Sequence, residues 1–376
     1  MFRKAYYNKV ISWGDGMNEI KFFLGASNAR KYVSYFSESY VPTEFGKYFI
    51  LKGGPGTGKS TFMKKTASEI EKEGFTVHRI FCSSDPSSLD AVLFPELNAG
   101  IFDGTAPHVM DPVLPGICEE IINLGACWDS SVLRKNKDSL ARLSLYNSQL
   151  HKKASDYLFV ASRFDKENLH TAARALDGEK LDRYITRLCA REIGITEKKG
   201  GGKLKKCFLS AVTPEGIKVH YDTVVSLAER IIVINDEFSC VAPLIVGSFC
   251  SYALKNGLDV IACFCPLFPE EKIEHIFIPK LSLCIFSSNQ YHSAPKEFGR
   301  QIHGARFLDT KILALKRESI DFNKKAKSEL IDEAVKKLKT AKLIHDEMEN
   351  YYIGAINFDE VEKIRKETVL KIFALN

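Results

Sequence analysis

The chain has 376 residues, of which 45% are hydrophobic and 27% are charged, and its formal net charge is +6. This composition excludes an intrinsically disordered protein, and the length favours two domains over one. The charge permits an acidic partner such as nucleic acid but is too small to require one. No membrane-spanning helix is predicted, because the most apolar region, 244–268, is interrupted by Lys255, Asn256 and Asp259.

The sequence favours a cytoplasmic location. The opening stretch, MFRKAYYNKVISWGDG, is basic but lacks the apolar core of a signal peptide. The 10 cysteines include no CxxC pair, and several lie in apolar runs, which predicts reduced, buried thiols. Cys263 and Cys265 form the closest pair, but no second pair of ligands lies nearby, so a metal site is not predicted.

The clearest chemical signal is a glycine-rich loop between a predicted strand and a predicted helix. The strand reads KYFILK, and the helix after the loop stops at Gly74. Residues 53–60, GGPGTGKS, match the phosphate-binding pattern G-x-x-x-x-G-K-[ST]. The residues predicted to contact the nucleotide are Gly53, Gly54, Pro55, Gly56, Thr57, Gly58, Lys59, Ser60 and Thr61.

Each part of this loop has a physical role in the prediction. The glycines let the backbone turn its N–H groups towards phosphate oxygens, and the helix start adds its positive dipole end. Lys59 is predicted to reach the β- and γ-phosphates, while the Ser60 hydroxyl coordinates Mg²⁺ and Thr61 supports the turn. The sequence therefore predicts a site for Mg²⁺ and ATP.

A second metal-binding group is expected at the end of a buried strand. Asp103 follows the apolar stretch 98–102 and is predicted to hold Mg²⁺, directly or through water. Asp85, after the preceding strand, is the alternative, and a plain turn before Gly104 would also explain Asp103.

The group that would activate water is less clear from the sequence. Gly104 stands where many ATPases place a glutamate base. His108 is therefore predicted as a catalytic residue with Lys59 and Asp103, and the other candidates for the base are Asp111 and Glu96. Slow turnover is expected.

The chain carries an internal duplication. Shifting it by 183 positions places Lys72, Gly74 and Phe81 on Lys255, Gly257 and Phe264. Shifts of 185 upstream, 184 for the stretch from Pro95 to His108 and 180 downstream align further identical residues. Because the shift changes slowly and in few steps, we predict two repeats that cover nearly the whole chain.

The second repeat lacks the phosphate chemistry. On the same alignment Gly53 becomes Asp236, Gly58 becomes Val241, Lys59 becomes Ala242, Ser60 becomes Pro243 and Asp103 becomes Ser287. Asp236 and its neighbour Glu237 would repel a phosphate. The second repeat is therefore predicted to keep the fold without binding nucleotide.

The two repeats predict an α/β fold of two tandem, mainly parallel sheets flanked by helices, each with a helical arm. The glycine- and lysine-rich stretch 194–207 is predicted to be a linker. The predicted boundaries are 1–198 for the nucleotide-binding domain with its arm and 203–376 for the degenerate domain with its arm.

Each arm is amphipathic, and a helical hairpin is predicted in the middle of each. Basic residues on both arms indicate either a solvated helix face or a surface for a protein or nucleic-acid partner. In the first arm they are Arg134, Lys135, Lys137, Arg142, Lys152 and Lys153. In the second they are Lys316, Arg317, Lys324, Lys325, Lys327, Lys336, Lys337 and Lys339.

A duplicated chain can supply its own partner subunit. Many phosphate-transferring enzymes complete their site with a cation from a neighbouring subunit. We predict an intramolecular pseudo-dimer in which the second half senses or completes the ATP site, with Arg300 and Arg306 as candidates.

The stretches KGGPGTGKST, SSDPSSLDAV, PEL and DGTAPHVMDPVLPGICEEIINLGACW, together with the degenerate second half, carry a family resemblance. The chain resembles a functionally uncharacterised family of P-loop ATP-binding proteins from Firmicutes-type bacteria. This resemblance implies tandem P-loop NTPase domains, ATP and Mg²⁺ as ligands and a cytoplasmic location. It implies no known reaction.

Three functional classes follow from these observations. The first is a slow ATPase that acts as a switch or remodeller. The second is a small-molecule or nucleotide kinase, with the arm 131–194 as its lid. The third is a non-catalytic ATP-dependent regulator or nucleic-acid-binding protein.

Overall fold

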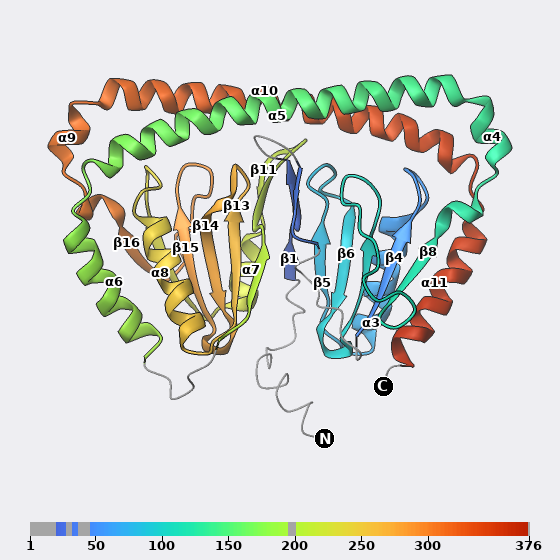
Figure 1. Cartoon of the computed structure of the whole chain (residues 1–376), viewed down its shortest axis with the longest axis horizontal. Helices are drawn as coiled ribbons and strands as arrows, with labels where there is room; N and C mark the ends of the chain where they lie inside the picture. Colours follow the sequence, from blue (N-terminus) through green and yellow to red (C-terminus); the bar gives the residue numbers. More distant parts are fainter. Residues whose placement is uncertain (1–19, 28–31, 37–45, 195–200, 375–376) are drawn as a thin grey trace.

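The computed structural model describes residues 20–27, 32–36, 46–194 and 201–374. They form two six-stranded sheets that stand side by side beneath a pair of long helices (Figure 1). The strands of the first sheet, in their order across it, are β1 (Ile20–Phe22), β5 (His78–Phe81), β6 (Leu89–Phe94), β7 (Ala99–Asp103), β4 (Lys47–Lys52) and β8 (Glu119–Asn123). The corresponding order in the second is β9 (Leu204–Cys207), β13 (Val260–Cys265), β14 (Phe268–Ile278), β15 (Leu283–Ser288), β12 (Arg230–Asn235) and β16 (Arg300–His303).

The two sheets have one topology. Within each sheet a single strand, β6 or β14, runs antiparallel to both of its neighbours, and the other neighbouring strands are parallel. Ala91 pairs with Phe102 in the first sheet, and His275 pairs with Phe286 in the second. These pairs are related by the same shift of 184 positions that the sequence gives. The mainly parallel α/β fold is therefore confirmed, and its two halves are equivalent strand by strand.

The halves meet through a symmetric contact. Phe23 and Phe208 exchange two backbone hydrogen bonds, of 2.9 and 2.8 Å, although 185 residues separate them. Both side chains are fully buried. Each lies just before a small antiparallel hairpin. These hairpins are β2 (Gly25–Ser27) with β3 (Tyr32–Ser34), and β10 (Ser210–Thr213) with β11 (Gly216–Val219). Equivalent residues that bond to each other place a pseudo-twofold axis at this point, as in a C2 dimer.

Helices cover the sheets at equivalent places. The helix after the glycine-rich loop is α3 (Lys59–Lys72), its counterpart is α8 (Ala242–Lys255), and α7 (Tyr221–Leu227) lies before β12. Short 3₁₀ turns follow the sheet strands at η1 (Pro95–Leu97), η2 (Leu124–Cys127), η3 (Pro279–Leu281) and η4 (Gly304–Phe307). The buried face of α3 includes Phe62, Met63 and Ile70, which pack in one apolar cluster with the buried strand residues.

The predicted hairpin in each arm is wrong. After the short helices α4 (Ser130–Lys135) and α9 (Thr310–Ala314), each arm is one continuous 37-residue helix, α5 (Lys137–Ala173) or α10 (Arg317–Ile353). The apolar stripe of α5 finds its partner on the other arm instead of folding back on itself. Ala154, Leu158 and Ala161 pack with residues of α10 such as Ala334 and Leu338 in one buried cluster.

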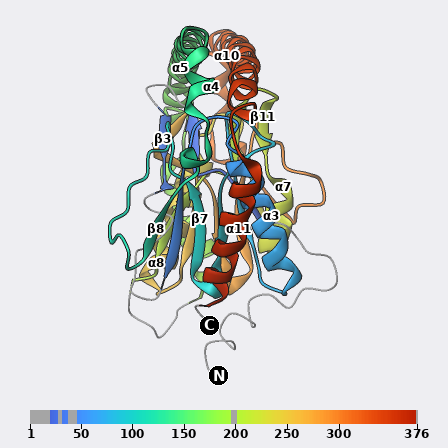
Figure 2. The same ribbon diagram turned by 90° about the vertical axis from the view of Figure 1, so that its right-hand side faces the viewer.

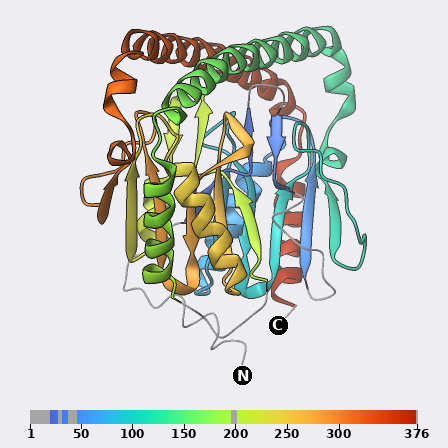
Figure 3. The same cartoon turned by 60° about the vertical axis from the view of Figure 1, so that its left-hand side comes forward.

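The arms also exchange their ends between the halves. The helix α6 (Gly178–Glu192) follows α5 but packs beside α8 of the second half (Figure 3). The helix α11 (Phe358–Phe373) follows α10 but packs against α3 of the first half (Figure 2). Two ion pairs hold α11 in place, Lys65 to Glu362 at 3.0 Å and Arg365 to Glu69 at 2.8 Å. The helix α11 is therefore part of the layer that covers the first half.

The predicted linker is shorter than expected. Residues 195–200 lie outside the described residues, as does the opening stretch 1–19. Leu204–Cys207 forms β9 because it pairs in parallel with β13 at the sheet edge, a contact that local composition does not reveal. All ten cysteines are free, and nine of them are buried. Among the described helices, none combines the length and the apolar character needed to cross a membrane.

Candidate functional site

The glycine-rich loop joins β4 to α3, as the sequence predicts. Gly56 and Gly58 have φ angles of 66° and 79°, a backbone region that L side chains rarely adopt. The Lys59 ammonium folds back over the loop and donates hydrogen bonds to the carbonyls of Gly53 and Gly54, both at 2.8 Å. These two bonds hold the lysine over the loop.

Asp103 lies beside this lysine. β7 pairs in parallel with β4, so Asp103 stands opposite Leu51, one residue before the end of β4. Its Oδ2 atom is 3.6 Å from Lys59 Nζ, and both side chains are largely buried. Its Oδ1 atom accepts a hydrogen bond of 2.9 Å from the Thr105 N–H. In the first turn of α3, Ser60 Oγ accepts a hydrogen bond of 3.0 Å from the Leu89 N–H. A carboxylate and a hydroxyl are groups that a hard cation such as Mg²⁺ prefers.

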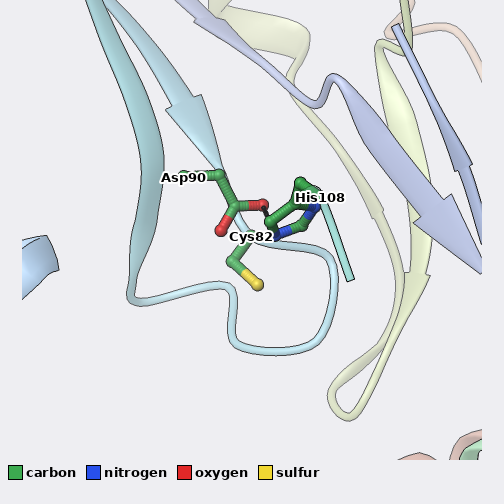
Figure 4. A group of neighbouring side chains, drawn as sticks. All are labelled: Cys82, Asp90 and His108. Atoms are coloured by element: carbon green, nitrogen blue, oxygen red, sulfur yellow. Dashed lines mark ion pairs between the residues drawn. The ribbon is translucent and has the colours of Figure 1, made fainter. Parts of the chain in front are cut away.

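His108 lies in a cluster with Asp90, which is also buried, and Cys82, which is half-buried (Figure 4). His108 Nε2 is 3.3 Å from Asp90 Oδ2, and both side chains are 5% exposed. Burial alone would lower the pKa of His108, but the charge and hydrogen bond of Asp90 outweigh it and raise the pKa. The ring also contacts Tyr32, with centroids 5.0 Å apart. This histidine is held by a carboxylate in the protein interior, an arrangement that positions it but does not expose it to water.

The other sequence candidates are distributed around the loop. Asp111 is exposed and pairs with Lys52 at 3.1 Å. Glu96 is bonded to the backbone and hydroxyl of Thr76. Asp85 lies in the loop that joins β5 to β6 and accepts hydrogen bonds from Ser87 and Ser88, which together with a lysine outweigh burial and lower its pKa.

The lysine that pairs with Asp85 comes from the second half. Lys342 of α10 lies 3.2 Å from Asp85 and also pairs with Asp346 of its own helix. Burial opposes the charge of Lys342, but the two carboxylates outweigh it and raise its pKa. A cation from the other repeat therefore stands at the carboxyl end of the first sheet.

A carboxylate from the same arm occupies the loop itself. Glu349 Oε1 accepts a hydrogen bond of 3.2 Å from the Gly56 N–H and lies 3.5 Å from His345 Nε2. The bond from His345 is the main cause of the lowered pKa of Glu349, and the Gly56 N–H adds to it against burial. A β-carbon at Gly56 would come within 2.7 Å of the Glu349 carbonyl oxygen. The loop and α10 therefore fit closely, and a glutamate oxygen lies where an anion would be bound.

Aromatic side chains enclose the rest of the loop. Trp128 and Tyr352, with ring centroids 5.4 Å apart, approach Gly54, and Phe358 of α11 approaches Gly58. Tyr352 and Phe358 belong to the second repeat, so the exchanged arm supplies part of the wall around the first repeat's loop. Flat apolar rings of this kind can also pack on a nucleobase.

The structure does not place the predicted arginines at the loop. Arg300 pairs with Glu192 of α6 at 3.4 Å, and Arg306 stacks over the ring of Tyr184, also in α6. Both therefore hold α6 against the second sheet. The prediction is wrong because Arg300 and Arg306 contact α6, whereas the residues of the second half that reach the glycine-rich loop come from α10.

The degenerate loop carries its own carboxylate. Asp236 Oδ2 accepts hydrogen bonds of 2.7 Å from the N–H groups of Val241 and Ala242, at the start of α8. Its side chain is 2% exposed. Burial raises the pKa of Asp236, and the N–H groups partly offset that effect. The sequence indicated only that this residue would repel phosphate. The structure adds that it takes the donors that a phosphate would use.

One feature of the site is kept in both halves. Glu274 and His292 stand at the positions of Asp90 and His108, shifted by 184, and the distance from His292 Nδ1 to Glu274 Oε2 is likewise 3.3 Å. Because the carboxylate–histidine pair persists where Gly58, Lys59 and Ser60 are replaced by Val241, Ala242 and Pro243, it does not depend on those residues.

Sequence analysis missed the residues that the second arm contributes. Lys342, His345 and Glu349 recur at three- and four-residue spacing and so share one face of α10. This spacing was a usable signal for a polar stripe, but only the tertiary structure shows what the stripe covers. No family model matches the chain, and neither the curated proteins nor the solved structures include a significantly similar one.

Proposed function

We propose that the first half of the chain binds Mg-ATP at residues 53–61 and that the protein is a slow ATPase that acts as a switch through α10. The observation that carries this proposal is the combination at the loop. Lys59 is held beside Asp103, and the Gly56 N–H is directed at a carboxylate of α10. Backbone N–H groups, a lysine and a helix start are the donors that phosphate-binding loops use.

The groups around the loop can be assigned roles from their positions. Lys59 would exchange its bonds to the Gly53 and Gly54 carbonyls for bonds to phosphate oxygens. Ser60 and Asp103 would hold Mg²⁺, which would neutralise charge on the phosphates. Lys342, the cation that the other repeat contributes beside Asp85, would act in the role expected of a trans-acting arginine.

The switch follows from competition between two anions. A phosphate that bonds to the Gly56 N–H must displace the Glu349 carboxylate, because one N–H group cannot serve both. Displacing Glu349 disturbs α10, which packs along α5 over both sheets and leads into α11. Nucleotide binding would therefore change the position of α10 relative to both halves.

Slow turnover is expected because each base candidate from the sequence already has a partner, including Asp111, which pairs with Lys52. Gly104 follows Asp103, His108 is buried against Asp90, and Glu96 is bonded to Thr76. Water activation would need His108 to release its carboxylate or a group from a partner protein to enter.

The experiment is to measure Mg-ATP binding by calorimetry and phosphate release for the wild type and for Lys59→Ala. The variant is expected to lose about a hundredfold in affinity, because a charged phosphate contact disappears. Lys72→Ala, at the far end of the same helix, is the matched control and should bind normally. Undiminished affinity in Lys59→Ala would contradict the proposal.

The turnover assay separates the remaining classes. Steady phosphate release by the protein alone supports the ATPase. Transfer of labelled phosphate to a component of an added metabolite mixture would instead identify a kinase. Tight binding with no turnover would identify a non-catalytic regulator.

A further inference from the structure

The second half contains a polar pocket that the nucleotide site does not use. It lies where β12, β13 and β15 end, a place where open α/β sheets commonly bind ligands. The segments that line it are 237–239 after β12, 266–267 after β13 and 289–292 after β15, with the hairpin β10–β11 at the side. The arms α5 and α10 pass over it. By the pseudo-twofold relation this pocket corresponds to the covered loop of the first half.

The charges in this pocket are balanced. Its lining contains three lysines and three carboxylates, and each lysine has an acidic partner. Lys272 lies 3.1 Å from Glu274, Lys327 lies 2.6 Å from Asp165, and Lys324 pairs with Glu237. The neighbouring His292 is neutral at physiological pH, since burial is the main cause of its lowered pKa.

The pairs differ in their access to water. Lys272–Glu274 and Lys327–Asp165 are buried or nearly so, and breaking a buried pair leaves an uncompensated charge. Lys324–Glu237 is more open, with side-chain exposures of 22% and 65%. An exposed pair contributes only about 0–1 kcal/mol, so a ligand can open it at little cost. Lys324–Glu237 is therefore the pair that can exchange its partners.

One further polar group lies beside the pocket. The hydroxyl of Tyr291 is buried and has no hydrogen-bond partner among the described residues. The Tyr291 ring is fixed by Lys327, whose ammonium lies 4.3 Å from its centroid. A buried hydroxyl without a partner costs free energy, which a bound acceptor would restore.

We propose that this pocket binds a small zwitterion of the free amino acid class, with its carboxylate on Lys324 and Tyr291 and its ammonium on Glu237. A zwitterion keeps the balance of charge when the Lys324–Glu237 pair opens, whereas a simple anion or cation would leave one member of the pair without a partner. A metal ion fits less well. Lys272 and Lys327 place two positive charges at the pocket.

The first half cannot form the same pocket. On the alignment, Lys272, Lys324 and Lys327 correspond to Ser88, Ser144 and Asn147. The lysines thus belong only to the half that has lost the phosphate loop. In the second half, side-chain ion pairs stand in place of the backbone N–H donors of the first half. The two halves would therefore bind different classes of ligand.

The test is a thermal-shift and calorimetric screen of the full chain with the standard L-amino acids, each at up to roughly 10 mM. At least one should bind with one-to-one stoichiometry, whereas acetate, inorganic phosphate and methylamine should not. Lys324→Ala and Glu237→Ala should each weaken binding on the order of tenfold, and Tyr291→Phe by about threefold. Lys325→Ala, on the exposed face beside Lys324, is the matched control and should leave binding unchanged.

Three results would overturn the proposal. One is that no amino acid binds, another is that acetate or methylamine binds equally well, and the third is that the three pocket variants bind like the wild type. Lys59→Ala should bind the amino acid normally, so failure of the nucleotide proposal and failure of this one are distinguishable.

Discussion

The two loops at residues 53–60 and 236–243 show how equivalent loops can hold a carboxylate in two different ways. Both place a carboxylate on N–H groups of the loop or at the start of the following helix. In the first loop the carboxylate is Glu349, which comes from another part of the chain and is partly exposed. In the second it is Asp236, which belongs to the loop itself and is buried.

The backbone keeps a trace of the common plan. Ser239 stands at the position of Gly56 and retains a positive φ of 53°, although it is not glycine. Val241, at the position of Gly58, has a φ of −98°. The degenerate loop has therefore lost the second of the two left-handed turns. Its carboxylate belongs to the loop and is buried, whereas the carboxylate at the first loop comes from α10 and is partly exposed.

The largest expected difference between the two loops is in how much their carboxylates contribute to the free energy of unfolding. Asp236→Ala should lower the free energy of unfolding by about 3 kcal/mol, because two buried N–H groups at the start of α8 lose a charged acceptor. Glu349→Ala removes one partly exposed bond and should cost less than about 1 kcal/mol. Urea unfolding of the two variants measures the difference. Equal costs would show that the two carboxylates are not fixed to different degrees.

The second half should also respond to acid through His275, whose counterpart in the first half is Ala91. Burial, with the charges of His292 and Lys272, lowers the pKa of His275 to about 3 against the attraction of Glu274. The unfolded chain therefore binds an extra proton here between about pH 6.5 and pH 3, so stability falls as the pH is lowered through that window.

The measurement is the free energy of unfolding against pH for His275→Asn, whose amide oxygen can still accept from the Ser287 N–H. The slope should decrease by up to about 1.4 kcal/mol per pH unit. His303→Asn is the exposed control and should follow the wild type. An unchanged slope in His275→Asn would show that the ring does not stay neutral in the folded protein.

The smallest effect concerns affinity. Glu349→Ala should raise the affinity for Mg-ATP by about threefold to tenfold, because the anion that competes for the Gly56 N–H is gone. Glu347→Ala is an exposed control on the same helix and should not change it. Calorimetric titration decides the point. A loss of affinity in Glu349→Ala would mean that the carboxylate assists the nucleotide, and the competition argument would fail.

The sequence by itself determined the features that depend on local pattern. Strand, loop and helix around Lys59 follow from apolar runs and from glycines at positions where the backbone has a positive φ. The mainly parallel sheets follow from alternating strands and helices, and the repeat follows from identities at a slowly changing shift. The place of Asp103 beside Lys59 follows because neighbouring parallel strands end at one edge of a sheet.

The tertiary structure decided what lies opposite these elements. Each long arm has an apolar stripe, but the stripe alone does not determine whether the arm folds back on itself or packs on the other arm. In the structure α5 packs on α10. The arm α10 brings Glu349 to Gly56, 293 residues earlier in the chain, and Lys342 to Asp85 in the loop after β5, while contacts with α6 hold Arg300 and Arg306. Contacts between halves depend on the relative placement of whole repeats, which no periodicity within either repeat encodes.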